Sequence, residues 1–198
     1  MDLPILILAA GLSSRMRGID KLLEPVGGIP LLRRQVDAAA QVSNAVFVAL
    51  PSQSHPRSNL IQDTDAKPIF VPDAADGMAH SLRRGIRALP DCQAFMVVLA
   101  DLVELGARDF QTLLDAHVAA PAKLIWRGAT QAGKPGHPII FDAKLRPAFE
   151  TLKGDTGGAP ILKQHKDKTH LVRLQGDRAL RDLDTPEDWA RWRAETQT

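Results

Sequence analysis

Short apolar runs alternate along this chain with longer segments whose apolar residues recur at helical spacing. The runs are typical of buried strands, and they lie at residues 4–10, 45–50, 67–71, 94–100, 122–126 and 170–174. Helical spacing between them predicts helices over residues 31–42, 78–89, 108–119 and 143–152. Strand–helix alternation of this kind predicts an α/β fold in three α/β/α layers, with a mainly parallel central sheet covered on both faces.

Length and composition limit what this chain can be. Its 198 residues, 44% of them hydrophobic, are enough for one sizeable core, so we expect a single domain over 1–198 with a frayed tail over 193–198. A formal charge of +2 gives no support to a nucleic-acid surface. Cys92 is the only cysteine, which excludes an internal disulfide. The apolar run at residues 4–10 is far shorter than the ~20 residues of a membrane span. We therefore expect a cytoplasmic protein that binds neither nucleic acid nor membrane.

The first apolar run leads directly into a segment that suits phosphate binding. Residues 11–21 read Gly-Leu-Ser-Ser-Arg-Met-Arg-Gly-Ile-Asp-Lys, which is small, hydroxylated and cationic. The backbone N–H groups of such a loop can wrap a polyphosphate, while Arg15 and Lys21 supply charge to its oxygens. An ordinary strand-to-helix turn with solvated cations is the alternative. The loop has neither the Gly-Lys-Ser/Thr ending of a Walker loop nor a G-x-G-x-x-G pattern.

An acidic residue ends the apolar strand predicted at residues 94–100. Asp101 follows Val97-Val98-Leu99-Ala100, where a carboxylate is costly unless a positive charge meets it. Mg²⁺ is the usual partner of carboxylates that handle nucleotide phosphates, so Asp101 is a candidate metal ligand. A helix N-cap is the alternative role.

Two further acids lie near the C-terminus. Asp182 and Asp184 occupy alternate positions of an extended segment, so their carboxylates point the same way and a bound cation would relieve their repulsion. Asp184 is the preferred ligand, and an exposed turn is the alternative. Thr185 and Pro186 follow directly and are typical of a helix start.

The segment Leu8-Ala9-Ala10-Gly11-Leu12-Ser13-Ser14-Arg15-Met16, followed by Lys21, closely resembles the signature of the molybdenum-cofactor nucleotidyltransferase family. These cytidylyltransferases and guanylyltransferases join a nucleotide to molybdopterin, and they have a Rossmann-like nucleotidyltransferase fold. The resemblance extends from Leu3 to about Trp192. It implies Mg²⁺ as cofactor, held by Asp101 and Asp184, and catalytic roles for Arg15, Lys21 and Asp101. It also implies a nucleotide site made of Leu8, Ala9, Ala10, Gly11, Ser13, Ser14, Arg15, Lys21, Gly77, Ser81 and Asp101.

Three other segments extend the resemblance. Residues 77–83, Gly-Met-Ala-His-Ser-Leu-Arg, are similar to the family segment that lies against the base and ribose. Residues 136–141, Gly-His-Pro-Ile-Ile-Phe, resemble a strand entry of the family, and residues 154–157, Gly-Asp-Thr-Gly, resemble one of its loops. Both are expected near the acceptor substrate. They imply that the acceptor is bound by His137, Asp155 and Gly157.

The chain departs from the family pattern at several positions. Val103 stands where the family usually has a proline, and Pro135 stands where it often has a basic residue, although Lys134 and Lys153 lie close by to supply the charge. Thr156 and Ala159 occupy the second acceptor loop. These departures motivate one alternative from another class: a non-catalytic maturation factor that binds the cofactor and hands it to a molybdoenzyme.

The resemblance implies that an acceptor phosphate attacks the α-phosphorus of a nucleoside triphosphate and that pyrophosphate leaves. CTP is the favoured nucleotide, because members that use GTP tend to have glycine where this chain has Ala10, and the added methyl group would crowd a purine. Molybdopterin is the favoured acceptor. The alternatives within the class are GTP with the same acceptor, and CTP or UTP with a sugar or polyol phosphate.

Overall fold

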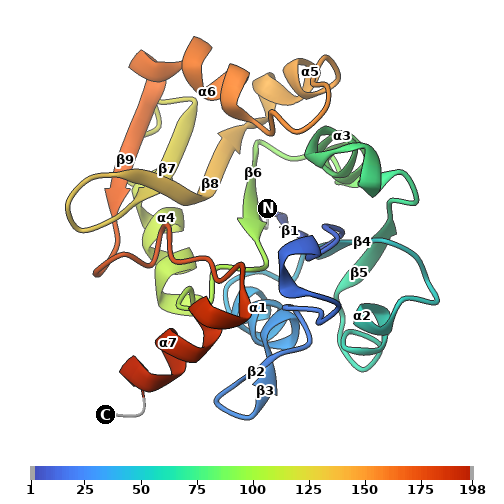
Figure 1. Cartoon of the computed structure of the whole chain (residues 1–198). Coiled ribbons are helices and arrows are strands. Elements are labelled where there is room, and N and C mark those ends of the chain that lie inside the picture. The colour runs from blue at the N-terminus through green and yellow to red at the C-terminus, as the bar shows by residue number, and fades with distance from the viewer. Residues whose placement is uncertain (1–2, 197–198) are drawn as a thin grey trace.

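The computed structural model describes residues 3–196 and centres on a seven-stranded sheet (Figure 1). In sheet order the strands are β5 (Lys67–Phe70), β4 (Val46–Leu50), β1 (Ile5–Leu8), β6 (Ala94–Leu99), β8 (Pro135–Asp142), β7 (Ile125–Ala129) and β9 (Thr169–Arg173). All neighbouring strands pair in parallel except β8, which runs antiparallel to both β6 and β7. The predicted mainly parallel sheet is confirmed.

Helices cover both faces of this sheet (Figure 1). One face carries α1 (Leu31–Ala40), α4 (Ala107–Ala119) and α7 (Pro186–Thr196), and the other carries α3 (Met78–Ala88), α5 (Arg146–Phe149) and α6 (Ala159–Gln164). Successive side chains along each strand point to opposite faces of the sheet, so they pack into two separate cores. In β1, Ile5 and Ile7 belong to the first core and Leu6 belongs to the second. The predicted three-layer α/β/α architecture is confirmed.

The remaining elements are short and connect the layers. They are η1 (Ser14–Met16), the hairpin strands β2 (Pro25–Val26) and β3 (Ile29–Pro30), α2 (Pro56–Asn59), η2 (Ala74–Asp76), η3 (Ala143–Leu145) and η4 (Lys166–Lys168). Among residues 3–196, no helix combines the length and the apolar character that crossing a membrane requires.

Three predictions about local structure were wrong in detail. The strand expected at 122–126 begins only at Ile125, where pairing with β8 and β9 starts. The helix expected over 143–152 divides into η3 and α5, because Pro147 has no N–H to donate within a continuous helix. Residues 193–196 of the expected frayed tail belong to α7, which is held against the first core by Trp189 and Trp192; residues 197 and 198 lie outside the described part of the chain.

The sheet topology places two loops together. Leu8 at the end of β1 is paired with Leu99 at the end of β6, and the two strands are parallel. The loop that begins at Ala9 and the turn that holds Asp101 therefore leave the same edge of the sheet side by side. This is the edge at which open α/β sheets bind their ligands.

Candidate active site

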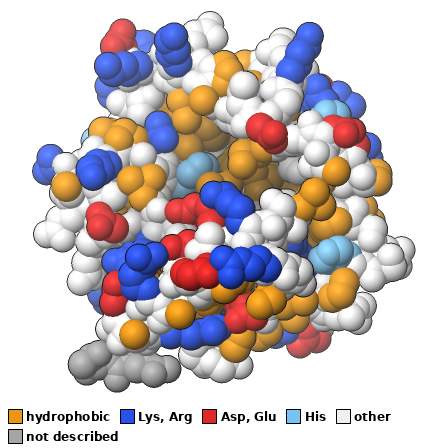
Figure 2. Space-filling view, in the orientation of Figure 1, with side chains coloured by type: hydrophobic (Ala, Val, Ile, Leu, Met, Phe, Trp, Pro, Cys, Tyr) orange, Lys and Arg blue, Asp and Glu red, His pale blue; other side chains and the backbone are white. Residues whose placement is uncertain are grey.

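A cavity of about 380 Å³ lies where β1 and β6 end, and we call it the nucleotide cavity after the ligand that the sequence predicts for it. Figure 2 shows the hollow on this face of the molecule, with hydrophobic side chains in its depth and charged side chains gathered along one edge. The cavity is lined by every residue predicted to bind the nucleotide, namely Leu8, Ala9, Ala10, Gly11, Ser13, Ser14, Arg15, Lys21, Gly77, Ser81 and Asp101, and also by Asp184. The fold therefore brings the predicted nucleotide residues to one place.

The loop after β1 contains two strained residues. Ser13 and Arg17, on either side of η1, have φ angles of 51° and 53°, in the left-handed region that non-glycine residues rarely adopt. Conformations of this kind cost roughly 1–3 kcal/mol each, and they persist only where surrounding contacts hold them. The contacts around this loop should therefore be strong.

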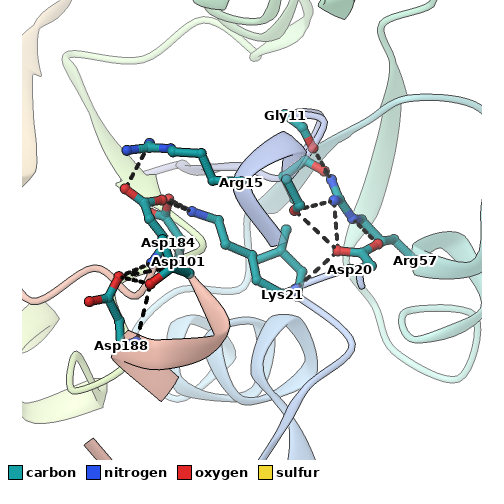
Figure 3. A network of polar contacts seen from close by, with 12 residues as sticks. Gly11, Arg15, Asp20, Lys21, Arg57, Asp101, Asp184 and Asp188 are labelled. Carbon is teal, nitrogen blue, oxygen red and sulfur yellow. Dashed lines mark hydrogen bonds and ion pairs between the residues drawn. The ribbon is translucent and has the colours of Figure 1, made fainter. Parts of the chain in front are cut away.

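Arg57 of α2 supplies those contacts (Figure 3). Its side chain is only 2% exposed, and its guanidinium donates to the carbonyl oxygens of Ala9 at 2.6 Å and Gly11 at 2.7 Å. The same group donates to both carboxylate oxygens of Asp20 at 2.7 Å and to the Ser13 hydroxyl at 3.1 Å. Arg57 thus joins the start of the loop to the residue that precedes Lys21. The sequence carries no motif around Arg57 that indicates this role.

We expect Arg57→Met to destabilise the protein by about 3–5 kcal/mol, because it leaves Asp20 without its buried cation and two carbonyl groups without donors. Urea denaturation measures this loss. The matched control is Arg87→Met, which removes an exposed ion pair with Glu150 and should cost less than about 1 kcal/mol. Equal losses in the two variants would contradict the role given to Arg57.

Lys21 lies between two carboxylates (Figure 3). Its Nζ is 2.7 Å from Oδ2 of Asp101 and 2.7 Å from Oδ1 of Asp184, while Arg15 Nη2 lies 2.7 Å from the other oxygen of Asp184. Burial lowers the pKa of Lys21, but the two carboxylates outweigh burial, and the net shift is upward. Lys21 is therefore a fully charged ammonium at neutral pH.

A short backbone pairing explains how these two carboxylates meet. Leu102, directly after Asp101, forms an isolated antiparallel bridge with Asp182, and the N–H of Val103 donates to the carbonyl of Arg181 at 3.3 Å. A proline at position 103, which the family resemblance led us to expect, has no N–H for this bond. Val103 therefore contributes to holding the segment that carries Asp184.

The helix start predicted at Thr185 and Pro186 is confirmed. Thr185 Oγ1 accepts from the backbone N–H of Asp188 at 3.2 Å, and Asp188 Oδ2 accepts from the backbone N–H of Thr185 at 3.0 Å. This reciprocal capping fixes the beginning of α7. Asp188 Oδ2 also accepts from the backbone N–H of Asp184 at 3.3 Å, so the cap orients the residue proposed as a metal ligand.

The donor set of this site fits a magnesium ion. Oδ1 of Asp101 is buried and has no hydrogen-bond partner among residues 3–196. Burial together with Asp184 raises the pKa of the neighbouring Asp182 carboxyl. Within residues 3–196, no three or more His, Cys, Asp or Glu side chains are grouped so as to hold a metal by themselves. Mg²⁺ commonly takes one or two carboxylates and completes its coordination with substrate phosphates and water. Asp101 and Asp184 match that pattern.

A second cavity of about 290 Å³ adjoins the first, and we call it the acceptor cavity. The three residues predicted to bind the acceptor, His137, Asp155 and Gly157, all line it, and Asp155 lines both cavities. Asp155 also has a structural bond that the sequence did not predict, because its Oδ1 accepts from the backbone N–H of Met78 at the start of α3 (3.1 Å). The predicted acceptor residues are therefore brought together beside the nucleotide site.

His137 is a neutral side chain in this cavity. Burial, and secondly the positive charge of Arg127, lower the pKa of His137 to about 4. Its Nδ1 is buried and has no hydrogen-bond partner in the described part of the chain. His137 can therefore offer a polar contact to a ligand but carries no charge at neutral pH.

A model of the MobA-like NTP transferase domain family matches residues 5–169. The chain belongs to this family. Among curated relatives of this MobA-like domain, nicotine blue oxidoreductase of Paenarthrobacter nicotinovorans is 28% identical over 207 residues, which cover 96% of this chain and 97% of the relative. The bifunctional protein GlmU of Leifsonia xyli subsp. xyli is 28% identical over 183 residues and 89% of this chain, but the chain spans only 35% of the length of that GlmU.

Solved structures agree with the fold of this MobA-like domain. The crystal structure of Rv0371c from Mycobacterium tuberculosis H37Rv, in complex with manganese, superposes with a TM-score of 0.78 and 22% identity, covering 96% of this chain and 97% of that one. The fold is thus a Rossmann-like nucleotidyltransferase fold, as the family resemblance implied. At 22% identity this likeness shows the fold and assigns no role to any residue of this chain.

Proposed function

We propose that this nucleotidyltransferase-family domain transfers CMP from CTP to the phosphate of molybdopterin and releases pyrophosphate. The observation that carries the proposal is that two cavities adjoin. One is lined by residues of the loop at 11–21 together with Asp101 and Asp184, the other is lined by His137, and Leu8, Met78, Leu99 and Asp155 lie in the walls of both. A nucleotide and an acceptor in these cavities would meet at this shared wall, where Leu99 lies two residues before Asp101 and the Asp101, Asp184, Lys21 and Arg15 cluster lines the nucleotide side.

The reaction needs little covalent chemistry from the protein. An oxygen of the acceptor phosphate forms a bond to the α-phosphorus, and the bond from that phosphorus to the pyrophosphate oxygen breaks. A phosphate monoester is already largely a dianion at neutral pH, since its second pKa is about 6, so no general base is needed. A pKa lowered to about 4 makes His137 a weak base at neutral pH, which is consistent with a step that has no proton to remove.

The charged side chains stabilise the phosphates. Asp101 and Asp184 would hold Mg²⁺, which when bound neutralises charge on the reacting phosphates. Lys21 and Arg15 belong to the loop at residues 11–21, pair with these carboxylates and line the nucleotide cavity, so both lie where they could stabilise the departing pyrophosphate. Fixed cations aimed at developing charge are usually the largest contribution to catalysis of this kind.

Preference for CTP rests on Ala10, which lines the nucleotide cavity and packs in the second core with Ala79 and Leu82. Its methyl group is 1% exposed, so it has little room to move aside for a larger base. We expect Ala10→Gly to raise the use of GTP relative to CTP by roughly tenfold, since one methyl group in a pocket is worth only about 1–3 kcal/mol. The measurement is the ratio of kcat/KM for the two nucleotides. An unchanged ratio, or a wild-type preference for GTP, would favour a guanylyltransferase.

The experiment that tests the proposed function is a panel of the four nucleoside triphosphates against molybdopterin and common sugar phosphates, with Mg²⁺ and with pyrophosphate release as the readout. We expect release with CTP and molybdopterin. Tight binding of molybdopterin without release under any nucleotide would favour the maturation factor instead. Because one relative is named as an oxidoreductase, consumption of a reduced nicotinamide nucleotide is measured separately, and we expect none.

A further inference from the structure

Arg127, in the middle of β7, faces the acceptor cavity without a carboxylate partner. Its Nε donates to the carbonyl oxygen of Gly136 at 3.0 Å, and no ion pair joins its guanidinium to any Asp or Glu among residues 3–196. The side chain is half-buried, and burial lowers the pKa of Arg127. A cation that has lost water without gaining an anion is costly, so an anionic ligand would be stabilised at this position.

Arg127 lies where two cavities join. The acceptor cavity shares Arg127, Ala159 and Leu162 with an outer cavity of about 480 Å³ near α6 and β9. The outer cavity has an apolar wall that includes Leu162 and Leu171, while Lys163 and Lys166 add positive charge. This combination suits a ligand that carries an anionic group on a body with apolar surface.

His137 interacts both with Arg127 and with Asp101, the predicted metal ligand. Arg127 and Asp101 both act electrostatically on the His137 ring, in opposite directions. The His137 side chain lines the cavity that Arg127 also lines, and its buried Nδ1 has no hydrogen-bond partner among residues 3–196.

The cations expected to replace the family's basic residue do not lie in this cavity. Lys134 and Lys153 are exposed and line neither the acceptor cavity nor the outer one, so the linings of these cavities give no support to the expectation that they supply the charge missing at Pro135. Arg127 reaches the same place from β7 instead, because its guanidinium bonds the backbone directly after Pro135.

We propose that Arg127 binds the phosphate of the acceptor and orients it toward the nucleotide, an inference that rests on the proposed nucleotidyl transfer. The class of acceptor that fits is a phosphate monoester whose body has an apolar surface to lie on Leu162 and Leu171. A small, fully hydroxylated sugar phosphate would leave that surface uncovered. Arg127 is thus a substrate-binding residue outside the family motifs.

The kinetic test compares Arg127→Gln with wild-type enzyme, using CTP and molybdopterin. Loss of a charge-assisted hydrogen bond is expected to raise KM for the acceptor by about tenfold or more, with KM for CTP unchanged. Arg127→Lys should recover only part of the affinity, because an ammonium lacks the guanidinium fork. The matched control is Arg173→Gln on β9, an exposed arginine that lines none of these cavities, and it should change neither KM. An unchanged acceptor KM in Arg127→Gln would overturn the inference and leave the proposed function intact.

A binding measurement separates the inference from turnover. Inorganic phosphate is titrated by calorimetry into protein saturated with α,β-methylene-CTP, which fills the nucleotide cavity and cannot react. We expect phosphate to bind wild-type protein and Arg173→Gln equally, and Arg127→Gln at least about tenfold more weakly. Equal binding to all three proteins would overturn the inference. Phosphate binding that depends on Arg127, in a protein that turns over no nucleotide, would support this anion site while rejecting the proposed function.

Discussion

Asp101→Asn is expected to reduce turnover by roughly a thousandfold or more. The Asp101 carboxylate would hold a divalent cation that stabilises the transition state by several kcal/mol, and asparagine cannot replace a carboxylate in this role. The side chain keeps its size and one oxygen. It loses the negative charge that forms an ion pair with Lys21 and that would bind Mg²⁺.

The same substitution should change stability little. The variant loses an ion pair with Lys21, but it also loses repulsion between Asp101 and the nearby acids Asp182 and Asp184. These effects oppose one another, so we expect the free energy of unfolding to change by less than about 1 kcal/mol. Pyrophosphate release and urea denaturation measure the two quantities.

The control for this prediction is Asp115→Asn on α4, an exposed acid that accepts from Gln111 on its own helix. It should leave both turnover and stability unchanged. Asp184→Asn should behave like Asp101→Asn. Wild-type rates in either site variant would remove that residue from the metal site.

Lys21→Met is expected to lower kcat/KM by roughly a hundredfold, the scale of ~3 kcal/mol for a fixed charge that stabilises a transition state. Lys21 is the cation that both carboxylates share, so its loss also leaves Asp101 and Asp184 facing each other. Titration of CTP by calorimetry separates loss of nucleotide binding from loss in the chemical step.

Mg²⁺ provides a second readout of Lys21→Met. Because the ammonium no longer neutralises the two carboxylates, we expect Mg²⁺ to bind the variant more tightly, and to raise its Tm more, than in wild-type protein. Lys144→Met, on the short helix η3, is the control and should respond like wild type. An equal response of Tm to Mg²⁺ in Lys21→Met would contradict the placement of the ion at these carboxylates.

The layers of the fold were predictable because buried strands and amphipathic helices leave a local pattern in the sequence. The apolar runs at residues 4–10 and 94–100 could be recognised separately, and the parallel pairing of β1 and β6 then put their ends together. The antiparallel strand β8 was harder, because its first residues include Pro135, Gly136 and Pro138, which do not resemble a strand.

The grouping of the predicted nucleotide residues around one cavity could be anticipated because those residues form contiguous motifs, whereas the residues that support the loop do not. Arg57 acts through backbone carbonyls and through Asp20, which lie far from it in the sequence. Arg127 lies in an ordinary strand, and only the packing of β7 beside the acceptor cavity shows that this arginine lines it. Contacts made by folding between distant segments leave no local signal.

The most direct test of the central claim is the fate of radiolabel from CTP. With Mg²⁺ and molybdopterin, label from [α-³²P]CTP should move into the acceptor product, one pyrophosphate should appear for each labelled product, and label from [γ-³²P]CTP should appear only in pyrophosphate. Asp101→Asn serves as the inactive reference. Transfer of the γ-label to the acceptor, or binding of both substrates with no transfer of the α-label, would contradict nucleotidyl transfer.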